Sequence, residues 1–413
     1  MSRGISGYLR VAPAGLDAGG VKATSMGSQS GDVIVVGAGL IGLSIAFELA
    51  ERGAAVRVYD RAEPARAASW AGAGMLAPYT ERITNEALLA LCASSLAAYP
   101  AFAGRVLAAS GIDPHLRIEG VFYAAFEDEG LDALRRHAEQ LIARGVACEM
   151  LDRSRALAAE PWLGAALAGG LLKNGEGYVD NRRLGRALVA ACEARRVRIE
   201  QSFRTQVECD SRRVLGVRTD RGFNGARAVV NACGAWASEL PGVPHSCVPP
   251  IEPIKGQMIA LNVPIGFVRR ATWVPGAYLV PRDDGRLLIG ATVESTGFDE
   301  RVTAEGIHEL LHAALAAAPS LGGFTMTESW AGVRPGTPDT LPCVGPTPIE
   351  GFFLATGHYR NGILLAPATA CLIADAIEHN QTAALEPFSL GRFAVRKTQD
   401  DTEERALERM TRA

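Results

Sequence analysis

An α/β fold of two or three domains is what the sequence predicts, on three observations. The chain has 413 residues, and at roughly 150 residues per domain this length suits two or three domains around a large buried core. Hydrophobic residues make up 48% of the chain and charged residues 21%, with 45 glycines, which is typical of a globular enzyme. Near the N-terminus, a β-branched run passes through a glycine-rich loop into a helical period.

The elements of this first unit follow in order. Val33–Val36 is predicted to be a buried strand, and Gly37-Ala38-Gly39-Leu40-Ile41-Gly42 follows it directly. Apolar residues then recur at helical spacing up to Ala50, and Gly53 favours a stop. Residues 56–60 are predicted to form the next strand, which ends in an acidic residue.

This β-α-β pattern with G-x-G-x-x-G predicts a dinucleotide site. Gly37 permits the tight turn, Gly39 lets the backbone approach a pyrophosphate, and Gly42 allows close packing of the helix. Asp60 is predicted to accept hydrogen bonds from the ribose hydroxyls. The unit by itself suits the adenosine of either FAD or NAD.

Composition narrows the class of protein and its location. With 42 Lys and Arg residues against 45 Asp and Glu residues, the net charge is −3, so no basic field favours nucleic acid as a partner. The eight cysteines include no C-x-x-C pair, which favours inert core thiols in a reducing cytoplasm. The apolar stretch 33–49 is interrupted by glycines and Glu48, so no stable membrane insertion is expected.

Two later regions are predicted to return to the cofactor. Strands at 207–209, 214–219 and 228–233 lead into Gly234-Ala235-Trp236. The strand 352–356 is followed by a loop, after which Gly362 opens a long apolar helix. The start of a helix binds negative charge, so this end is expected to face the ligand.

Several further motifs resemble a known family. Over about residues 32–385 the chain resembles the FAD-dependent glycine oxidases of thiamine biosynthesis, within the D-amino acid oxidase family. Besides the glycine loop, the resemblance is carried by Ala71-Gly72-Ala73-Gly74-Met75-Leu76, Tyr278-Leu279-Val280-Pro281-Arg282, Gly290-Ala291-Thr292, Trp330-Ala331-Gly332-Val333-Arg334-Pro335-Gly336-Thr337 and Gly357-His358-Tyr359-Arg360-Asn361-Gly362-Ile363-Leu364-Leu365-Ala366-Pro367.

The resemblance implies a Rossmann-like FAD-binding domain interleaved with a substrate domain built on an antiparallel sheet. The FAD-binding segments are expected at 32–88, 165–247 and 326–388, and the substrate segments at 89–164 and 248–325. Residues 1–31 are expected to be a disordered or leader extension, and residues 389–413 a C-terminal tail.

The cofactor implied by the resemblance is non-covalent FAD. The residues expected to hold it are Gly37, Gly39, Leu40, Ile41, Gly42, Asp60, Arg61, Ala68, Ser69, Ala73, Gly74, Met75, His358, Tyr359, Arg360, Asn361, Gly362, Ile363 and Leu364.

The expected reaction oxidises a small amino acid to its imine and 2-oxo acid, with O2 reduced to H2O2. Transfer of a hydride from Cα needs a well-oriented substrate and no dedicated base. Arg334 is expected to hold the substrate carboxylate through its planar fork, with Tyr278 and Arg360 completing the catalytic set. Val293 stands where a methionine is expected in relatives, and Gly276 is also small, so glycine, sarcosine and small D-amino acids all remain possible substrates.

Two alternatives stay open. The first is a D-amino acid dehydrogenase that passes electrons to a respiratory acceptor. The second is a zinc peptidase, because His308-Glu309-Leu310-Leu311-His312 matches H-E-x-x-H, although no third ligand is evident and an amphipathic helix over 303–318 accounts for the pattern better, so no metal is expected. The resemblance also favours a homo-oligomer, with a tetramer as one form that relatives take.

Overall fold

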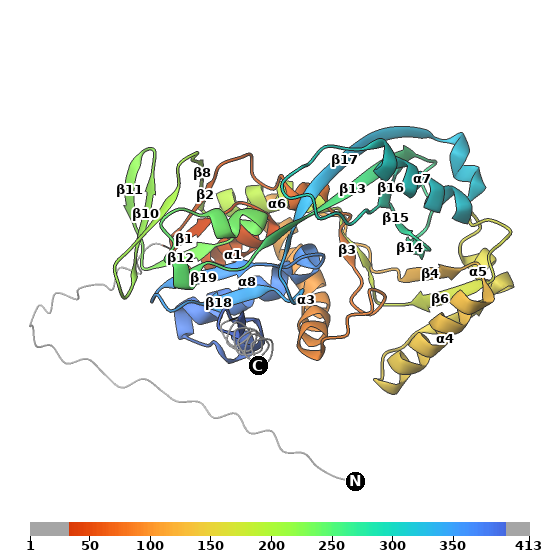
Figure 1. Cartoon of the computed structure of the whole chain (residues 1–413), viewed down its shortest axis with the longest axis horizontal. Helices are drawn as coiled ribbons and strands as arrows, with labels where there is room; N and C mark the ends of the chain where they lie inside the picture. The colour runs from red at the N-terminus through yellow and green to blue at the C-terminus, as the bar shows by residue number, and fades with distance from the viewer. Residues whose placement is uncertain (1–32, 394–413) are drawn as a thin grey trace, which may run out of the picture. The chain divides into compact units, whose positions relative to one another are not determined.

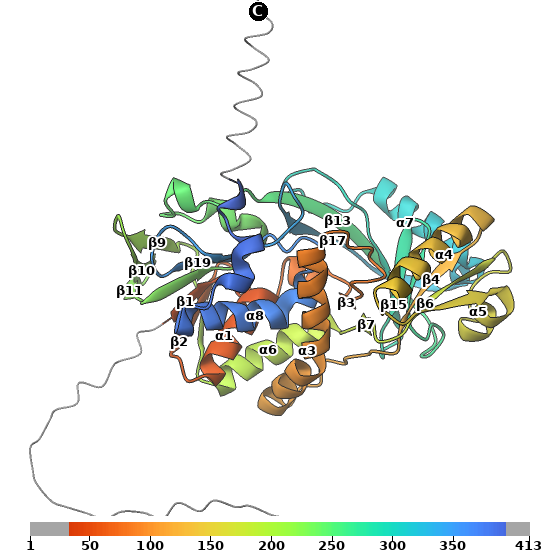
Figure 2. The ribbon, with the colours of Figure 1, turned by 90° about the horizontal axis from the view of Figure 1, so that it is seen from below.

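The computed structural model describes residues 33–393 (Figures 1 and 2). The extension expected over residues 1–31 and most of the expected C-terminal tail lie outside the described residues. Two large sheets organise the described chain, one of six strands and one of eight.

The six-stranded sheet is the predicted dinucleotide-binding sheet. Its order is β18 (Cys343–Pro346), β19 (Phe352–Thr356), β12 (Ala228–Asn231), β1 (Val33–Val36), β2 (Val56–Asp60), β8 (Arg198–Gln201). All neighbours run parallel except β18 and β19. Strand β1 therefore lies between β2 and β12, at the switch point where α/β sheets bind ligands.

Both faces of this sheet are covered, which explains the β-branched run in β1. Val33 and Val35 pack with the helices α1 (Leu40–Glu51), α3 (Glu86–Ser110), α6 (Asn181–Ala194) and α8 (Gly362–His379), which contact one another beside the sheet (Figure 2). Ile34 and Val36 face the opposite way, toward the three-stranded sheet of β9 (Gln206–Cys209), β10 (Val214–Thr219) and β11 (Gly222–Gly225). A strand buried on both faces reads as a continuous apolar run.

The eight-stranded sheet carries the second layer. Its order is β17 (Thr325–Gly336), β13 (Glu252–Asn262), β16 (Arg286–Gly290), β15 (Ala277–Pro281), β14 (Ala271–Val274), β4 (Val121–Ala125), β6 (Gly169–Lys173), β5 (Glu149–Asp152). The helices α4 (Asp128–Ala143), α5 (Arg153–Ala159) and α7 (Ala304–Ala317) pack against it. The pairs are antiparallel as expected, apart from β14 and β4, which run parallel.

Several short elements complete the described fold. They are α2 (Ala68–Ala71), the pair β3 (Met75–Leu76) and β7 (Gly177–Tyr178), and the 3-10 turns η1 (Gly234–Glu239), η2 (His245–Cys247), η3 (Pro319–Gly323) and η4 (Ala383–Phe388). Helix α3 packs on α6 and α8, whereas β6 and β17 belong to the eight-stranded sheet. The expected domain boundaries, which divide these elements differently, stay predictions.

Two helices have the composition of a membrane span. By length and hydropathy, α3 and α8 are long and apolar enough to cross a bilayer. A buried core helix has the same composition, and α3 and α8 pack against each other, with α8 also packing on α1. Whether the chain avoids membranes stays a prediction.

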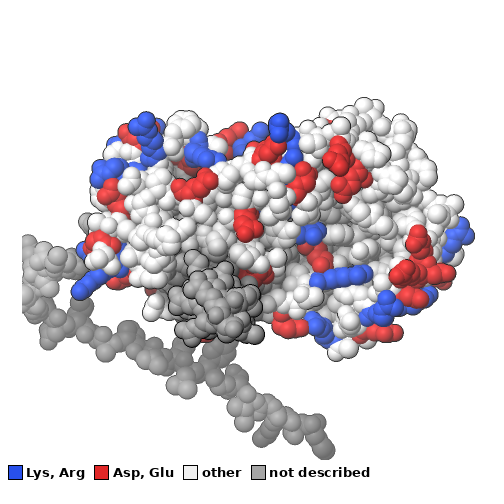
Figure 3. All heavy atoms as spheres, viewed as in Figure 1, with Lys and Arg blue, Asp and Glu red and all other residues white. Residues whose placement is uncertain are grey.

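The distribution of surface charge and the state of the cysteines agree with what the composition predicts. On the face shown in Figure 3, positive and negative residues are interspersed. All eight cysteines are free, and four of them, Cys92, Cys192, Cys247 and Cys343, are buried. Burial raises the pKa of the Cys192 thiol to about 12, which keeps it protonated and unreactive.

Candidate active site

A cleft lies where the two large sheets meet. It is lined by the start of α1, the segment around α2 and β3, the ends of β12 and β19, residues of β13, β15 and β17, and the start of α8. Its empty volume, including the part open to solvent, is about 1100 Å³. Clefts at the switch point of an α/β sheet are typical sites for organic ligands.

The glycine loop forms one end of the cleft as its spacing predicts. Gly37 has a φ of +111°, and a Cβ there would lie 2.3 Å from the carbonyl oxygen of Ala232. A Cβ on Gly42 would lie 1.9 Å from the carbonyl oxygen of Gly37, so this glycine lets α1 pack onto the loop. Gly39 lines the cleft itself.

Asp60 shapes this loop from the end of β2. Its Oδ2 accepts a hydrogen bond of 2.6 Å from the Ala38 N–H, and its Oδ1 accepts one of 2.9 Å from the Ala62 N–H. The next residue, Arg61, places its guanidinium 4.3 Å from the centre of the Trp236 ring. Neither side chain lines the cleft, so a contact of Asp60 with a ribose stays a prediction.

Residues 68–75 form one wall of the cleft, and side chains of other elements donate hydrogen bonds to the carbonyl groups of this wall. Asn181, the first residue of α6, donates hydrogen bonds to the carbonyl oxygens of Ser69 and Trp70 at 2.8 and 3.1 Å. Trp330 donates to the Ala71 carbonyl at 2.9 Å. Gly74 has a φ of +76°, and a Cβ there would lie 1.9 Å from the Val179 carbonyl oxygen.

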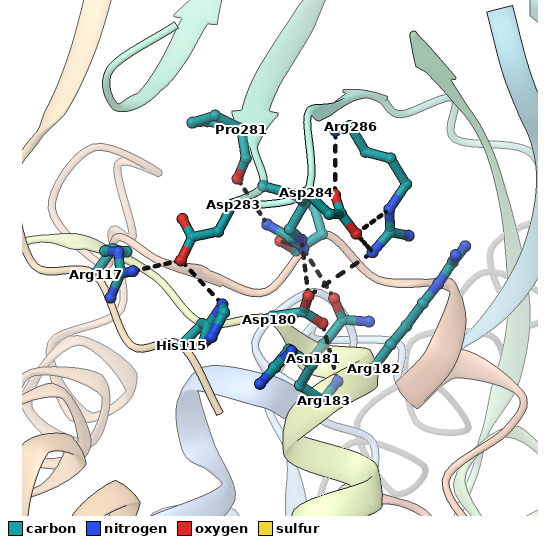
Figure 4. Close-up of polar contacts among 12 residues, drawn as sticks. His115, Arg117, Asp180, Asn181, Arg182, Arg183, Pro281, Asp283, Asp284 and Arg286 are labelled. Carbon is teal, nitrogen blue, oxygen red and sulfur yellow. Dashed lines mark hydrogen bonds and ion pairs between the residues drawn. The ribbon is translucent and has the colours of Figure 1, made fainter. Parts of the chain in front are cut away.

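Arg282 completes this support from the eight-stranded sheet. It follows β15, is 5% exposed, and donates hydrogen bonds to the Ala73 carbonyl at 2.8 Å and to the Asn181 Oδ1 at 3.0 Å. The Asp180 carboxylate lies 3.8 Å from the Arg282 guanidinium. The same carboxylate caps α6 by accepting a hydrogen bond from the Arg183 N–H (Figure 4). The wall is thereby tied to both sheets.

Substitution of Arg282 should weaken binding of the cofactor. The change Arg282→Gln leaves the buried Ala73 carbonyl without its donor, so we expect the Kd for FAD to rise roughly 5- to 100-fold. Fluorescence titration of the apoprotein with FAD measures this. The control is Arg301→Gln, because Arg301 pairs with Asp299 and does not line the cleft. An unchanged Kd in Arg282→Gln would show that the wall holds its position without this residue.

The start of α8 forms the far side of the cleft. His358 is buried, and its Nε2 lies 3.1 Å from the Thr369 hydroxyl. Burial lowers the pKa of His358 to about 3, so the ring is neutral. Gly362 and Ile363 line the cleft, and the first turn of α8 contains no acidic residue, which leaves the positive end of the helix dipole facing the cavity.

The three predicted catalytic residues meet in this cleft. Tyr278 of β15, Arg334 of β17 and Arg360 after β19 all line it. Burial raises the pKa of the Tyr278 hydroxyl, whereas Arg334 and Arg360 act to lower it, Arg334 also through a hydrogen bond. Arg334 lies near the end of β17, which continues through Gly336, so its position is fixed by the ladder with β13.

Glu81 is a cleft residue that sequence reasoning missed. It lies on the segment after β3 and faces the same cavity as Arg334 and Arg360. Burial raises the pKa of the Glu81 carboxyl, while the two arginines act to lower it. No motif surrounds Glu81, and its place depends on how the segment 77–82 folds.

A polar network holds Arg334 in place. Its Nη1 donates hydrogen bonds of 3.1 Å to the carbonyl oxygens of Lys255 and Thr292. Lys255, only 1% exposed, forms an ion pair of 3.0 Å with Glu294. Although burial acts to raise the pKa of Glu294, hydrogen bonds from Thr292, Gln257 and Lys255 hold it below its usual value. Glu294 is therefore ionised. It pairs with Lys255, the residue whose carbonyl accepts a hydrogen bond from Arg334.

Gly256 gives Arg334 its space. A Cβ on Gly256 would lie 2.2 to 2.5 Å from three atoms of the Arg334 guanidinium. The strand must therefore carry glycine there for the arginine to lie flat across it.

The structure places most of the predicted cofactor residues at the cleft. Those that line it are Gly39, Leu40, Ile41, Ala68, Ser69, Ala73, Gly74, Met75, His358, Tyr359, Arg360, Gly362 and Ile363. Those that do not are Gly37, Gly42, Asp60, Arg61, Asn361 and Leu364. Gly37, Gly42 and Asp60 shape the loop instead.

Whether Val293 borders the substrate stays a prediction. Its side chain is 57% exposed, and it does not line the cleft. Thr292 and Glu294 turn toward the network around Gln257, and side chains alternate along an extended chain, so Val293 points to the opposite side from that network. Gly276 is also outside the lining and exposed.

The H-E-x-x-H motif lies on α7 and faces solvent. His308 and His312 are exposed, with ring centres 6.0 Å apart. Within residues 33–393 there is no group of three His, Cys, Asp or Glu side chains placed to hold a metal ion.

Comparison with known proteins identifies the family. The model of the family described as FAD dependent oxidoreductase matches residues 32–376. The chain belongs to this family. Among curated relatives, a glycine oxidase of Pseudomonas aeruginosa is 39% identical over 349 residues, which cover 83% of this chain and 93% of that protein. The protein of Synechocystis named bifunctional protein ThiO/ThiG is 37% identical over 371 residues, 88% of this chain and 54% of that protein.

A solved structure also supports the membership of this chain in the family. The crystal structure of glycine oxidase from Geobacillus kaustophilus matches with a TM-score of 0.81 and 37% identity, covering 87% of this chain and 98% of that chain. The predicted fold class and the predicted cofactor, non-covalent FAD, are confirmed.

The residues of this FAD-dependent oxidoreductase fit its cofactor. The starts of α1 and α8 both open on the cleft, and neither first turn carries an acidic residue. Two such helix ends suit the negative charges of a pyrophosphate and of a flavin ring system. Gly39 and residues 73–75 of the wall would hold FAD next to these two helix starts.

A buried carboxyl group supports the segment that carries Glu81. Glu176 is fully buried, and its Oε1 accepts hydrogen bonds from the N–H groups of Tyr79 at 2.6 Å and Thr80 at 3.2 Å. The Thr80 hydroxyl donates to the Oε2. Burial raises the pKa of Glu176 to about 7, although these hydrogen bonds and Lys173 act to lower it.

This group should make stability depend on pH. The pKa of Glu176 is about 7 in the folded chain and 4.5 ordinarily, so between these values only the folded chain keeps the proton. Stability therefore falls as pH rises through this window. Relative to Glu176→Gln, the wild type should lose on the order of 1–3 kcal/mol between pH 5 and 8. Urea unfolding of both proteins at the two pH values tests this, and parallel pH dependence would contradict it.

Proposed function

We propose that this flavoenzyme oxidises glycine to glyoxylate and ammonia through the imine, with O2 reduced to H2O2. Sarcosine and small D-amino acids are further candidate substrates. The observation that carries the proposal is the meeting of Arg334, Tyr278 and Arg360 in the cleft that the cofactor segments line. The named activity of the 39% identical relative supports it.

The chain's residues bind and orient the substrate. When bound, FAD supplies the acceptor for two electrons. The guanidinium of Arg334, fixed by two backbone carbonyls, offers its remaining N–H groups to the substrate carboxylate. The Tyr278 hydroxyl, which lies within hydrogen-bonding reach of Arg334, donates to the same carboxylate. Arg360 adds positive charge at the mouth of the cleft.

Peroxide release from the FAD-loaded protein tests this function. We expect H2O2 with glycine, and the rates with sarcosine and D-alanine rank the substrates. Flavin bleaching by each amino acid without oxygen is measured alongside. Bleaching without peroxide in air would favour the dehydrogenase instead, and no bleaching by any of the three would refute the substrate class.

We also propose that the imine supplies thiazole formation in thiamine biosynthesis. The relative named ThiO/ThiG, in which the part similar to this chain covers about half of the protein, supports this role. A deletion strain should then need an external thiazole source for growth, and growth without one would contradict the role. A cytoplasmic location and a homo-oligomeric state complete the proposal.

A further inference from the structure

A second cavity lies on the other side of the segment that carries Glu81. It lies between this segment, the start of α3 and one face of α4, and its empty volume, including the part open to solvent, is about 1000 Å³. We propose that it binds a small phosphomonoester with an apolar body, and that this binding alters the substrate cleft.

The charge of the cavity favours an anion. Arg82, Arg136 and Arg144 line it, and Arg144 pairs with Glu86 at 2.7 Å. Neither Arg82 nor Arg136 forms an ion pair with any residue of the described chain; the guanidinium of Arg82 lies 5.2 Å from the centre of the Tyr123 ring. Two unpaired guanidinium groups match the two charges of a phosphomonoester better than the single charge of a carboxylate.

Helix α4 arranges these groups on one wall. Arg136, Gln140 and Arg144 recur at intervals of four residues and so share one face of the helix. His137, one residue along, lies 2.9 Å through its Nε2 from the carbonyl oxygen of Tyr79. Since a carbonyl only accepts, Nε2 carries the hydrogen, so this side chain binds the segment. Burial lowers the pKa of His137, which disfavours a further cation here.

The remaining lining selects for an apolar body. Tyr79, Ile83, Leu89 and Leu141 border the same cavity. Such a mixture of apolar walls with a few converging polar groups is typical of a site for an organic ligand. Inorganic phosphate is therefore expected to bind more weakly than an aryl phosphate.

The cavity and the substrate cleft share one short segment. Tyr79 and Arg82 border the cavity, and Glu81 between them lines the cleft. The carbonyl of Tyr79 accepts from the Arg82 N–H at 3.3 Å as well as facing His137. Arg82 itself has a φ of +55°. A ligand that draws Arg82 toward α4 therefore moves the residue that precedes it, Glu81, relative to Arg334 and Arg360.

Calorimetric titration of the FAD-loaded protein with phenyl phosphate at constant ionic strength tests binding. We expect a Kd of about 1 mM or lower, and a rise of at least tenfold in Arg82→Gln and in Arg136→Gln. The matched control is Arg135→Gln, because Arg135 pairs with Asp132 on α4 and does not line the cavity. No binding at 10 mM, or equal weakening in the control, would overturn the site.

Three further measurements distinguish a ligand site in this cavity from a protein contact and from binding in the substrate cleft. Binding should persist in Arg334→Ala, and its loss there would place the ligand in the substrate cleft and refute the proposal. A change of subunit assembly in Arg136→Gln with unchanged phosphate binding would make the cavity a protein contact instead. Saturating phenyl phosphate should change the KM for glycine at least threefold in the wild type. In Arg82→Gln and Arg136→Gln, it should leave this KM unchanged. The coupling between this cavity and the substrate cleft rests on the proposed function. Binding with an unchanged KM would refute that coupling and would leave the binding site itself supported.

Discussion

Replacement of Arg334 by alanine should lower kcat/KM for glycine by roughly 30-fold to several thousandfold. Removal of one partner of a buried charge pair costs on the order of 2–5 kcal/mol, and this guanidinium is the proposed partner of the substrate carboxylate. FAD content should survive, because the segments expected to hold FAD make no hydrogen bond to the Arg334 side chain. Steady-state kinetics with peroxide detection, together with the flavin absorbance of the purified protein, gives both quantities.

The variant Arg334→Lys is a useful companion. It keeps the charge but loses the planar fork, so its kcat/KM should fall between those of the wild type and Arg334→Ala. Normal efficiency of Arg334→Ala at full FAD occupancy would show that another group binds the carboxylate. A protein without flavin would instead show that Arg334 supports the fold of the cleft.

The substitution Gly256→Ala should be nearly as damaging, although it adds one methyl group outside any motif. The new Cβ would lie 2.2 to 2.5 Å from three guanidinium atoms of Arg334, so the arginine must move. A displacement of about 1 Å in a positioning group can cost on the order of 100-fold in rate. We expect kcat/KM for glycine to fall about 10- to 100-fold, mostly through KM, because the carboxylate loses its aligned partner.

A glycine elsewhere provides the control. A Cβ on Gly104, in the middle of α3, would meet nothing within 4 Å, and alanine favours a helix by up to about 1 kcal/mol. Gly104→Ala should therefore keep the kinetics and raise the melting temperature slightly. If Gly256→Ala kept the KM of the wild type, the guanidinium would have room that the structure does not show. If its folded yield were low, expression of Gly256→Ala at lower temperature would allow the same comparison.

Local patterns predicted the parts of the fold that depend on neighbours in the sequence. The run Val33–Val36, the glycine loop and the strand that ends at Asp60 all form as their spacing predicts. The helix from Gly362 and the helix that carries the H-E-x-x-H motif also form, α7 with Thr303 as its N-cap. These elements depend on period, turn chemistry and caps, which act within a few residues.

The motifs of the family resemblance also named the polar residues that meet in the cleft. Tyr278, Arg334 and Arg360 lie together, as the resemblance implies. It did not reveal that Thr292 and Glu294 contact Gln257, because these residues lie 35 and 37 positions apart from it in the sequence.

By itself, then, the sequence determined the dinucleotide-binding unit, the cofactor and three of the polar residues that line the cleft. The tertiary structure decided how those residues are held: Arg282 and Asn181 behind the wall at 68–75, Lys255 and Gly256 behind Arg334, and Glu81 beside it. The physical reason is separation along the chain. Arg282 and Ala73 meet across 209 residues, and a contact of that kind leaves no period or spacing in the sequence, because it exists only after two sheets have packed together.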